Sequence, residues 1–269
     1  MKLYKIIKKP PFFLSASHWM TKVDTPVRSS VNSRQAVIIP LLLIQYGSLK
    51  AKFKSMSKLK RYFISSIKEM RVSAKSLKKN PHLGIKQIDE MTLKAMESYA
   101  HELGISTIGY TKIKSDYIFK DFEILYDNAI MFTMEMNKAL IDSNPSLESS
   151  REIFRTYETL GIAVNKLSDL LRDRGYNCHP SPAIGGDINT VPAARDANLG
   201  WIGKNGILIT PEYGPCVRLA AIFIDVDNLP IASKNDFEWI ETFCKTCQKC
   251  VKRSEEHTSE LQSRHNLVL

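Results

Sequence analysis

From residue 82 to about residue 240 the chain alternates between segments with a helical apolar period and short apolar runs rich in β-favouring residues. Helices are predicted at 88–101 and 146–174. The predicted strands are 106–110, 129–134, 207–210 and 217–226. This alternation predicts one mixed α/β (α+β) domain over 82–240.

Glycine and proline mark where these segments begin and end. Gly104 and Gly175 stop the two predicted helices, and Pro192 indicates the start of a further short helix that Gly200 stops. The tight connection at 211–215 predicts that the last two strands pair antiparallel.

The N-terminal part of the chain is strongly basic. Residues 1–80 contain 18 lysines and arginines but two acids, while the whole chain has a net charge of +10, so the remainder is mildly acidic. Over 48–79 an apolar stripe recurs in steps of four and three, and Asn80-Pro81 ends the predicted helix. The stripe consists of Leu49, Phe53, Met56, Lys60, Phe63, Ile67, Met70, Ala74 and Leu77.

Two interpretations of this basic segment stay open. It is either an amphipathic helix that binds an anionic partner, such as RNA or a lipid surface, or a helix packed on the main domain with its lysines outward. We favour the packed helix.

Nothing in the sequence predicts export or a membrane span. The longest apolar run, 36–44, contains Pro40 and is shorter than the roughly 20 residues that a bilayer requires, so it predicts a buried strand or short helix. Residues 1–10 carry lysines without a following apolar region and cleavage site. We therefore expect a cytoplasmic protein.

Three of the five cysteines, Cys244, Cys247 and Cys250, are spaced C-x2-C-x2-C. This spacing is typical of the start of a bacterial ferredoxin run, in which a tight loop delivers thiolates to a 4Fe-4S cluster. A zinc site is the alternative, and it needs a fourth ligand. The adjacent Cys178-His179 pair is interpreted as structural.

Ser254 stands where the ferredoxin run predicts a fourth cysteine. Residues 253–263 read RSEEHTSELQS, which is similar to a translated sequencing adapter, so 253–269 are left out of the fold prediction. We expect the natural chain to continue beyond Lys252, with 241–252 as the start of a ferredoxin-type module that carries two clusters in full.

The segment at 190–230 reads TVPAARDANLGWIGKNGILITPEYGPCVRLAAIFIDVDNLP. It resembles the segment before the ferredoxin module in reductive dehalogenases and epoxyqueuosine reductases, and the resemblance extends over about 100–252. The TPEYGP and VRL elements are closer to the dehalogenases, and WIGKN is closer to the epoxyqueuosine reductases. The resemblance implies a nitroreductase-like corrinoid-binding domain, with cobalamin and 4Fe-4S as cofactors.

The resemblance also implies roles for single residues. Asp187 and Tyr213 are the implied proton donors, although a helix-entry acid and a turn residue are the alternatives. Ile184 occupies the acid position of the epoxyqueuosine reductases, and Cys216 replaces an arginine common in dehalogenases. The residues implied to bind the corrinoid are Gly200, Gly203, Lys204, Asn205, Gly206 and Arg218. For the glycines the alternative is a helix stop and turn, and for the cations it is surface ion pairing.

The implied function is a reductase in which electrons pass from a 4Fe-4S cluster to cobalt and then to the substrate. Its partners would be an external low-potential electron donor and a small organic substrate or tRNA. Two alternatives remain: an electron-transfer or corrinoid-handling protein without its own substrate, and an inactive gene fragment.

Overall fold

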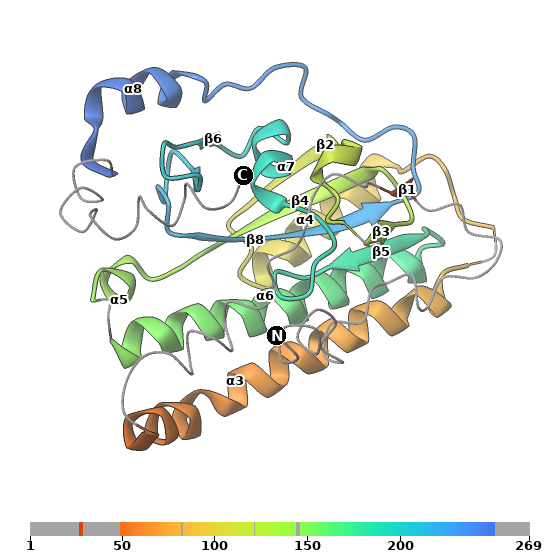
Figure 1. The fold of residues 1–269 in the computed structure, drawn as a ribbon. Coiled ribbons are helices and arrows are strands. Elements are labelled where there is room, and N and C mark those ends of the chain that lie inside the picture. Colours follow the sequence, from red (N-terminus) through yellow and green to blue (C-terminus); the bar gives the residue numbers. More distant parts are fainter. Residues whose placement is uncertain (1–26, 29–48, 82, 121, 144–145, 251–269) are drawn as a thin grey trace.

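A four-stranded antiparallel sheet forms the centre of the computed structural model, which describes residues 27–28, 49–81, 83–120, 122–143 and 146–250. The strand order is β2 (Thr107–Lys112), β4 (Asn128–Glu135), β8 (Val217–Ile224) and β5 (Cys178–Ser181). Helices α4 (Glu90–Glu102) and α6 (Leu147–Asp173) cover one face, and α7 (Thr190–Asp196) packs on the other (Figure 1). The predicted mixed α/β fold is confirmed.

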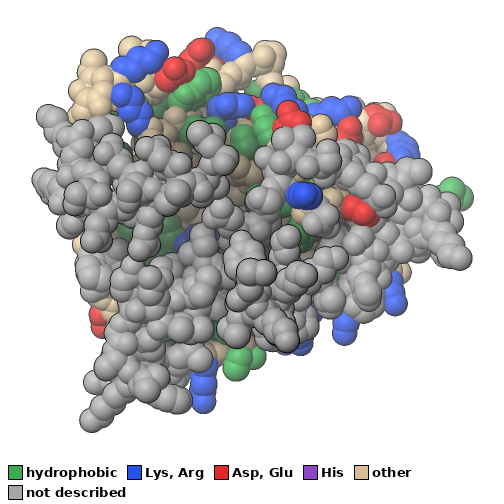
Figure 2. Space-filling view, viewed as in Figure 1, with side chains coloured by type: hydrophobic (Ala, Val, Ile, Leu, Met, Phe, Trp, Pro, Cys, Tyr) green, Lys and Arg blue, Asp and Glu red, His purple; other side chains and the backbone are tan. Residues whose placement is uncertain are grey.

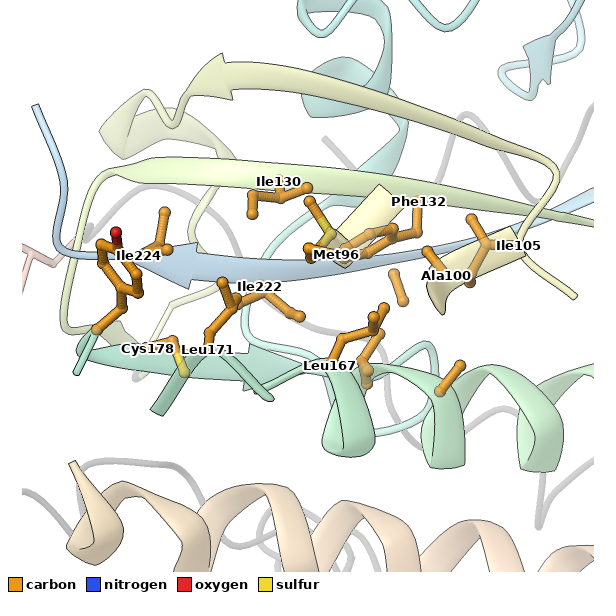
Figure 3. Close-up of a cluster of buried hydrophobic side chains, with 14 of the residues drawn as sticks. Met96, Ala100, Ile105, Ile130, Phe132, Leu167, Leu171, Cys178, Ile222 and Ile224 are labelled. Atoms are coloured by element: carbon orange, nitrogen blue, oxygen red, sulfur yellow. The ribbon is translucent and has the colours of Figure 1, made fainter. Parts of the chain in front are cut away.

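Strand β8 is buried on both faces. Ala220, Ile222 and Ile224 pack in the cluster under α6, and the alternate residues Ala221 and Phe223 pack in the cluster under α7. Figure 3 shows the α6 side, where Met96, Phe132, Leu167 and Ile222 meet between helix and sheet. Full burial of such a side chain contributes about 1.5–3 kcal/mol, so both faces stabilise β8 in a central position.

Local signals account for the helix boundaries. The Asp89 side chain accepts a hydrogen bond from the Thr92 amide and caps α4, and Ser146 forms a capping box with Ser149 at the start of α6. Asn189 caps α7 by accepting from the Val191 amide. The predicted helices 88–101 and 146–174 are confirmed to within two residues, while the short helix predicted to stop at Gly200 ends at Asp196.

Helix α3 (Leu49–Ser76), extended by the 3-10 turn η2 (Leu77–Lys79), lies along α6 (Figure 1). The buried residues described on its packed side are Leu59, Ser66, Met70, Ser73, Ala74, Ser76 and Leu77. Over 59–79 this arrangement supports the packed-helix interpretation. Lys60 and Phe63, both predicted on the stripe, are exposed. The apolar count also missed the three serines, whose hydroxyls bond to the Tyr62 carbonyl, to Asn165 and to the Ser73 carbonyl.

The predicted pairing of 207–210 with 217–226 is wrong. Strand β7 (Leu208–Ile209) pairs with β6 (Trp201–Ile202), while β8 leaves this hairpin and enters the central sheet. The physical reason is that β8 is apolar on both faces and therefore needs neighbours and helices on all sides. The two-residue strand β7 is too short to provide these neighbours.

The remaining elements are short. They are β1 (Val27–Arg28) paired with β3 (Glu123–Ile124), η3 (Ser115–Tyr117), α5 (Lys138–Asp142) and α8 (Trp239–Cys247). The run at 36–44 and the tail at 253–269 lie outside the described residues. Within the described ranges, no helix combines the length and apolarity that crossing a bilayer requires.

Candidate active site

The glycine segment and the cysteine helix are neighbours. Asn235 Nδ2 donates to the carbonyl of Gly200 at 3.1 Å. The Asp236 amide donates to Asn198 Oδ1 at 2.9 Å, and Asn198 Nδ2 donates back to Asp236 Oδ2 at 2.8 Å. These bonds hold the chain that leads into α8 against the turn before β6, and Figure 1 shows α8 beside β6. The chain that leads into the helix carrying Cys244 and Cys247 is therefore held against the segment at Gly200.

The β6–β7 hairpin presents an exposed tip. Lys204, Asn205 and Gly206 are exposed, and Asn205 Oδ1 accepts a hydrogen bond from the Ile207 amide. Gly206 has φ +73°, and among the described residues no atom beyond its chain neighbours lies within 4 Å of the place where a Cβ would be. The described part of the chain thus leaves open space at Gly206, where the corrinoid prediction requires close backbone approach.

Gly200 is required by the fold itself. Its φ is +151°, and a Cβ there would lie 2.3 Å from the Ile209 carbonyl oxygen. Gly200→Ala is therefore expected to cost about 1–3 kcal/mol of unfolding free energy, measured by urea titration. Gly206→Ala is the matched control. It introduces a side chain at a positive φ without a close contact, so it should lower the unfolding free energy less. Equal losses of unfolding free energy in the two variants would contradict a steric clash at Gly200.

A polar network fixes the residues before the hairpin. Tyr117 OH and Lys114 Nζ both donate to Asp196 Oδ2, at 2.6 and 2.8 Å, and Arg195 binds the other carboxyl oxygen. Burial alone would raise the pKa of Asp196, but these hydrogen bonds hold it below its usual range. The Arg195 guanidinium also lies 5.7 Å from the Trp201 ring centroid, so the network orients the first residue of β6.

Arg218 is the second residue of β8. Its side chain lies on the face of the sheet that α6 covers, opposite the face that carries the glycine hairpin. Its guanidinium stacks 4.0 Å from the centroid of Tyr157 on α6, and Nη1 donates to the Tyr157 hydroxyl at 2.9 Å. Nη2 lies 3.3 Å from Met136 Sδ. The structure therefore does not place Arg218 on the face that carries the glycine hairpin.

The Arg218 charge is poorly compensated. Nε is buried without a hydrogen-bond partner, and among the described residues no carboxylate forms an ion pair with the guanidinium. Burial consequently lowers the pKa of Arg218. The guanidinium thus contacts Tyr157 twice, through the hydrogen bond to its hydroxyl and by stacking on its ring.

Asp187 lies in the loop after β5 and is almost fully buried. Its Oδ2 is 3.3 Å from His179 Nε2, and the two side chains are 6% and 1% exposed. Tyr213 lies in the turn between β7 and β8, where its amide donates to Thr210 Oγ1 and its ring packs against the cluster under α7. The turn interpretation of Tyr213 thus has direct structural support, while the proton-donor roles of both residues stay predictions.

The three cysteines lie on and just after α8. Cys244 and Cys247 are half-buried, Cys250 is exposed, and all three are free thiols. Across the described ranges, these thiols are not gathered with other His, Cys, Asp or Glu side chains into a group that could hold a metal ion. Their chemistry still suits an iron–sulfur cluster, since thiolates are its usual ligands and the spacing supplies three of four.

Tyr157 and His179 were missed as site residues. Tyr157 carries no local motif, because it is one aromatic residue within the period of a long helix. His179 was interpreted as half of a structural Cys-His pair, and its partner Asp187 is visible only once β5 and the following loop are folded.

No family model matches the chain. A tetrachloroethene reductive dehalogenase of Desulfitobacterium hafniense is 31% identical over 148 residues, which is 55% of this chain and 26% of that protein. An epoxyqueuosine reductase of Listeria monocytogenes is 37% identical over 67 residues, 25% of this chain and 16% of that protein. The chain is a relative of the reductive dehalogenases and the epoxyqueuosine reductases.

The solved structures agree on the fold. A reductive dehalogenase described as suggesting a mechanism for B12-dependent dehalogenation aligns with 93% of this chain and 39% of its own, at TM-score 0.60 and 14% identity. The catabolic reductive dehalogenase NpRdhA, in complex with 3-bromo-4-hydroxybenzoic acid, aligns with 58% of this chain and 24% of its own, at TM-score 0.51 and 18% identity. This relative of the two reductase groups therefore has a dehalogenase-like fold and spans about a quarter of the length of the curated dehalogenases it matches.

Proposed function

We propose that this chain is part of an iron–sulfur and cobalamin-dependent reductase that acts on a small organic halide. Its relatives are reductases, and the longer sequence match is to a tetrachloroethene reductive dehalogenase. The structural observation that carries the proposal is the set of hydrogen bonds that hold the chain leading into the cysteine helix against the glycine segment at Gly200. On the other face of the sheet, the Tyr157 hydroxyl that accepts from Arg218 is the proposed tyrosine proton donor.

The residues of this chain divide into those that would hold the cofactors and those that would donate a proton. Cys244, Cys247 and Cys250 would supply three cluster ligands, and the tip of the β6–β7 hairpin would contact the corrinoid. When bound, these cofactors supply electrons one at a time from an external low-potential donor.

Tyr157 is the proposed donor to the carbon that loses the halide. Replacing a carbon–halogen bond by carbon–hydrogen takes two electrons and one proton and releases halide. Tyr157 gives the proton from its hydroxyl, and Arg218 stabilises the oxygen that is left negative. Asp187 and Tyr213 are retained as the alternative donors of this one proton.

Cofactor loading tests the proposal directly. The chain is reconstituted anaerobically with iron, sulfide and hydroxocobalamin, desalted, and assayed for metals and for chloride release from tetrachloroethene with reduced methyl viologen. Retained cobalt with chloride release is the expected result. Retained cobalt without turnover would favour a corrinoid-handling or electron-transfer protein, and loss of both metals an inactive fragment. The Cys244→Ser, Cys247→Ser and Cys250→Ser triple variant should lose iron.

A tRNA substrate is the second candidate, favoured by exposed cations on α3. Lys60, Arg61, Lys68 and Arg71 are all exposed on the side away from α6. Figure 2 shows Lys and Arg side chains projecting along the lower edge of the molecule, where α3 runs in Figure 1. Such a surface suits a phosphate backbone.

Charge reversal on α3 is expected to leave the organohalide reaction unchanged if the first proposal holds. If tRNA is the substrate, Lys68→Glu with Arg71→Glu should weaken tRNA binding about 10-fold or more and flatten its salt dependence. Binding is measured by fluorescence anisotropy at several salt concentrations. The matched control is Lys94→Glu with Lys112→Glu, which reverses two exposed lysines elsewhere.

A further inference from the structure

Asn198 occupies a backbone position that favours glycine. Helix α7 ends in a Schellman motif, in which the Asn198 amide donates to the Arg195 carbonyl at 3.0 Å and the Leu199 amide to the Ala194 carbonyl at 3.1 Å. Asn198 has φ +56°, in the left-handed region that glycine adopts most readily. Leu199 and Ala194 are also buried together in the cluster under α7. The turn is therefore held by backbone and apolar contacts, and it does not need the asparagine side chain.

That side chain bonds instead to the connection that leads into α8. Asn198 Oδ1 accepts from the Asp236 amide at 2.9 Å, and Nδ2 donates to Asp236 Oδ2 at 2.8 Å. The neighbouring Asn235 adds a second contact, because its Nδ2 donates to the carbonyls of Arg195 and Gly200. Two successive residues of the connection thus bind the turn after α7 on both sides of Asn198.

Among the described residues, few other contacts hold α8. Residues 231–234 of the connection are all exposed, so the connection itself does not fix where α8 begins. Ile240 is the one buried side chain of α8, whereas Trp239 and Phe243 are 57% and 56% exposed. A single buried isoleucine does not fix both the place and the direction of a nine-residue helix. The hydrogen bonds to the turn after α7 therefore decide where α8 lies.

We infer that Asn198 is a positioning residue for electron transfer. Through Asp236 it places the helix that carries Cys244 and Cys247 against the turn that enters the β6–β7 hairpin. The inference rests on the proposed function, in which the thiols hold the cluster and the hairpin tip contacts the corrinoid. Each transfer would oxidise the cluster and reduce the cobalt by one electron, and it moves no proton, so its rate depends on how the two are placed.

The test uses the full chain and variants that leave the turn intact. Asn198→Gly keeps the left-handed turn and removes both side-chain bonds. Asn198→Asp keeps an acceptor for the Asp236 amide but brings two carboxylates together. Asn198→Asp combined with Asp236→Asn again sets a donor opposite an acceptor, and aspartate also tolerates the left-handed region. This swapped pair is the matched control.

Hydrogen exchange of the α8 amides, measured by mass spectrometry without cofactors, is the first readout. A helix as short as α8 is marginal in water on its own, so its amides exchange once it is released. Two hydrogen bonds of ordinary strength correspond to about 10- to 100-fold in an opening equilibrium. We expect exchange at α8 to be faster by about this factor in Asn198→Gly and Asn198→Asp, and to return to the wild-type rate in the swapped pair. Exchange at α6 and the melting temperature should stay at wild-type values.

The rate of cobalt reduction in cofactor-loaded protein is the second readout. Asn198→Gly should retain as much iron as the wild type, because the three thiols lie on one short segment. A misplacement of about 1 Å can cost about 100-fold in rate, so we expect cobalt reduction by reduced methyl viologen to slow about 10-fold or more. The triple cysteine variant reports direct reduction of cobalt by the viologen, and its rate is subtracted. The swapped pair should restore the rate.

The outcomes separate the inference from the proposed function. Fast exchange at α8 in the wild-type chain, no change in Asn198→Gly, or faster exchange at α6 and α8 together overturns the inference whatever the cofactors do. An unchanged rate of cobalt reduction in loaded Asn198→Gly also overturns it. Failure of the loaded wild-type chain to retain iron and cobalt overturns the proposed function and with it the electron-transfer role, and hydrogen exchange still decides whether Asn198 positions α8.

Discussion

Tyr157→Phe is expected to reduce chloride release from tetrachloroethene by about 100- to 10,000-fold, the range typical for loss of a general acid. The variant keeps the ring that stacks on Arg218 and removes only the hydroxyl that accepts from Nη1. Folding and metal content should therefore stay at wild-type values. The measurement is kcat with reduced methyl viologen in protein of known iron and cobalt content.

Tyr213→Phe is the matched control for this prediction. Tyr213 packs in the turn between β7 and β8, so loss of its hydroxyl should change kcat less than about threefold, well within ordinary assay variation among folded variants. A larger loss in Tyr213→Phe than in Tyr157→Phe would transfer the donor role to Tyr213. Arg218→Met should lower kcat as Tyr157→Phe does, without a large loss of stability, because it removes a buried charge that has no described anionic partner.

Arg172→Met is expected to lower the unfolding free energy by about 3–5 kcal/mol, because it breaks a buried charged network and leaves polar partners unpaired. The Arg172 side chain is 4% exposed. Its guanidinium donates to Ser76 Oγ of α3 at 3.0 Å, to Asn80 Oδ1 at 2.8 Å and to the Cys178 carbonyl of β5 at 3.1 Å. One side chain thus ties α3 to α6 and to the sheet.

The effect is measured by chemical denaturation, with limited proteolysis to report release of α3. Arg174→Met is the matched control, since Arg174 is two residues away, half-buried, and donates to Thr92 Oγ1 at 3.2 Å. Its cost should be below about 1 kcal/mol. Equal costs for the two variants would contradict the role of Arg172 as the link between these elements.

Local chemistry made part of this fold predictable. The apolar period and the stops at Gly104, Gly175 and Gly200 are local, so sequence alone located α4, α6 and α7. Strand β5 was missed because its residues, Cys-His-Pro-Ser, have no strand pattern, and it is held by pairing with β8. The position of β8 depends on both sheet faces, which no short window of sequence contains.

The candidate site likewise combines features set by local sequence with contacts between distant segments. The cysteine spacing and the glycines at 200, 203 and 206 are local, and a short window of sequence is enough to locate each of them. The Tyr157–Arg218 contact joins residues 61 positions apart on a helix and a strand. The His179–Asp187 pair requires the loop after β5 to return to the sheet. Pairs of this kind follow from strand order, and the strand order was predicted incorrectly at β8.

The central position of β8 affects how the sheet forms while the chain is being synthesised. It is the last strand of the central sheet to leave the ribosome, yet it lies between β4 and β5, and β5 pairs with no other strand of that sheet. Until residues 217–224 emerge, β4 presents an open apolar edge and the ladder that holds β5 does not exist. The nascent chain must carry the unpaired edge of β4 while residues 136–216 are synthesised, which favours slow, late closure of the sheet and dependence on molecular chaperones.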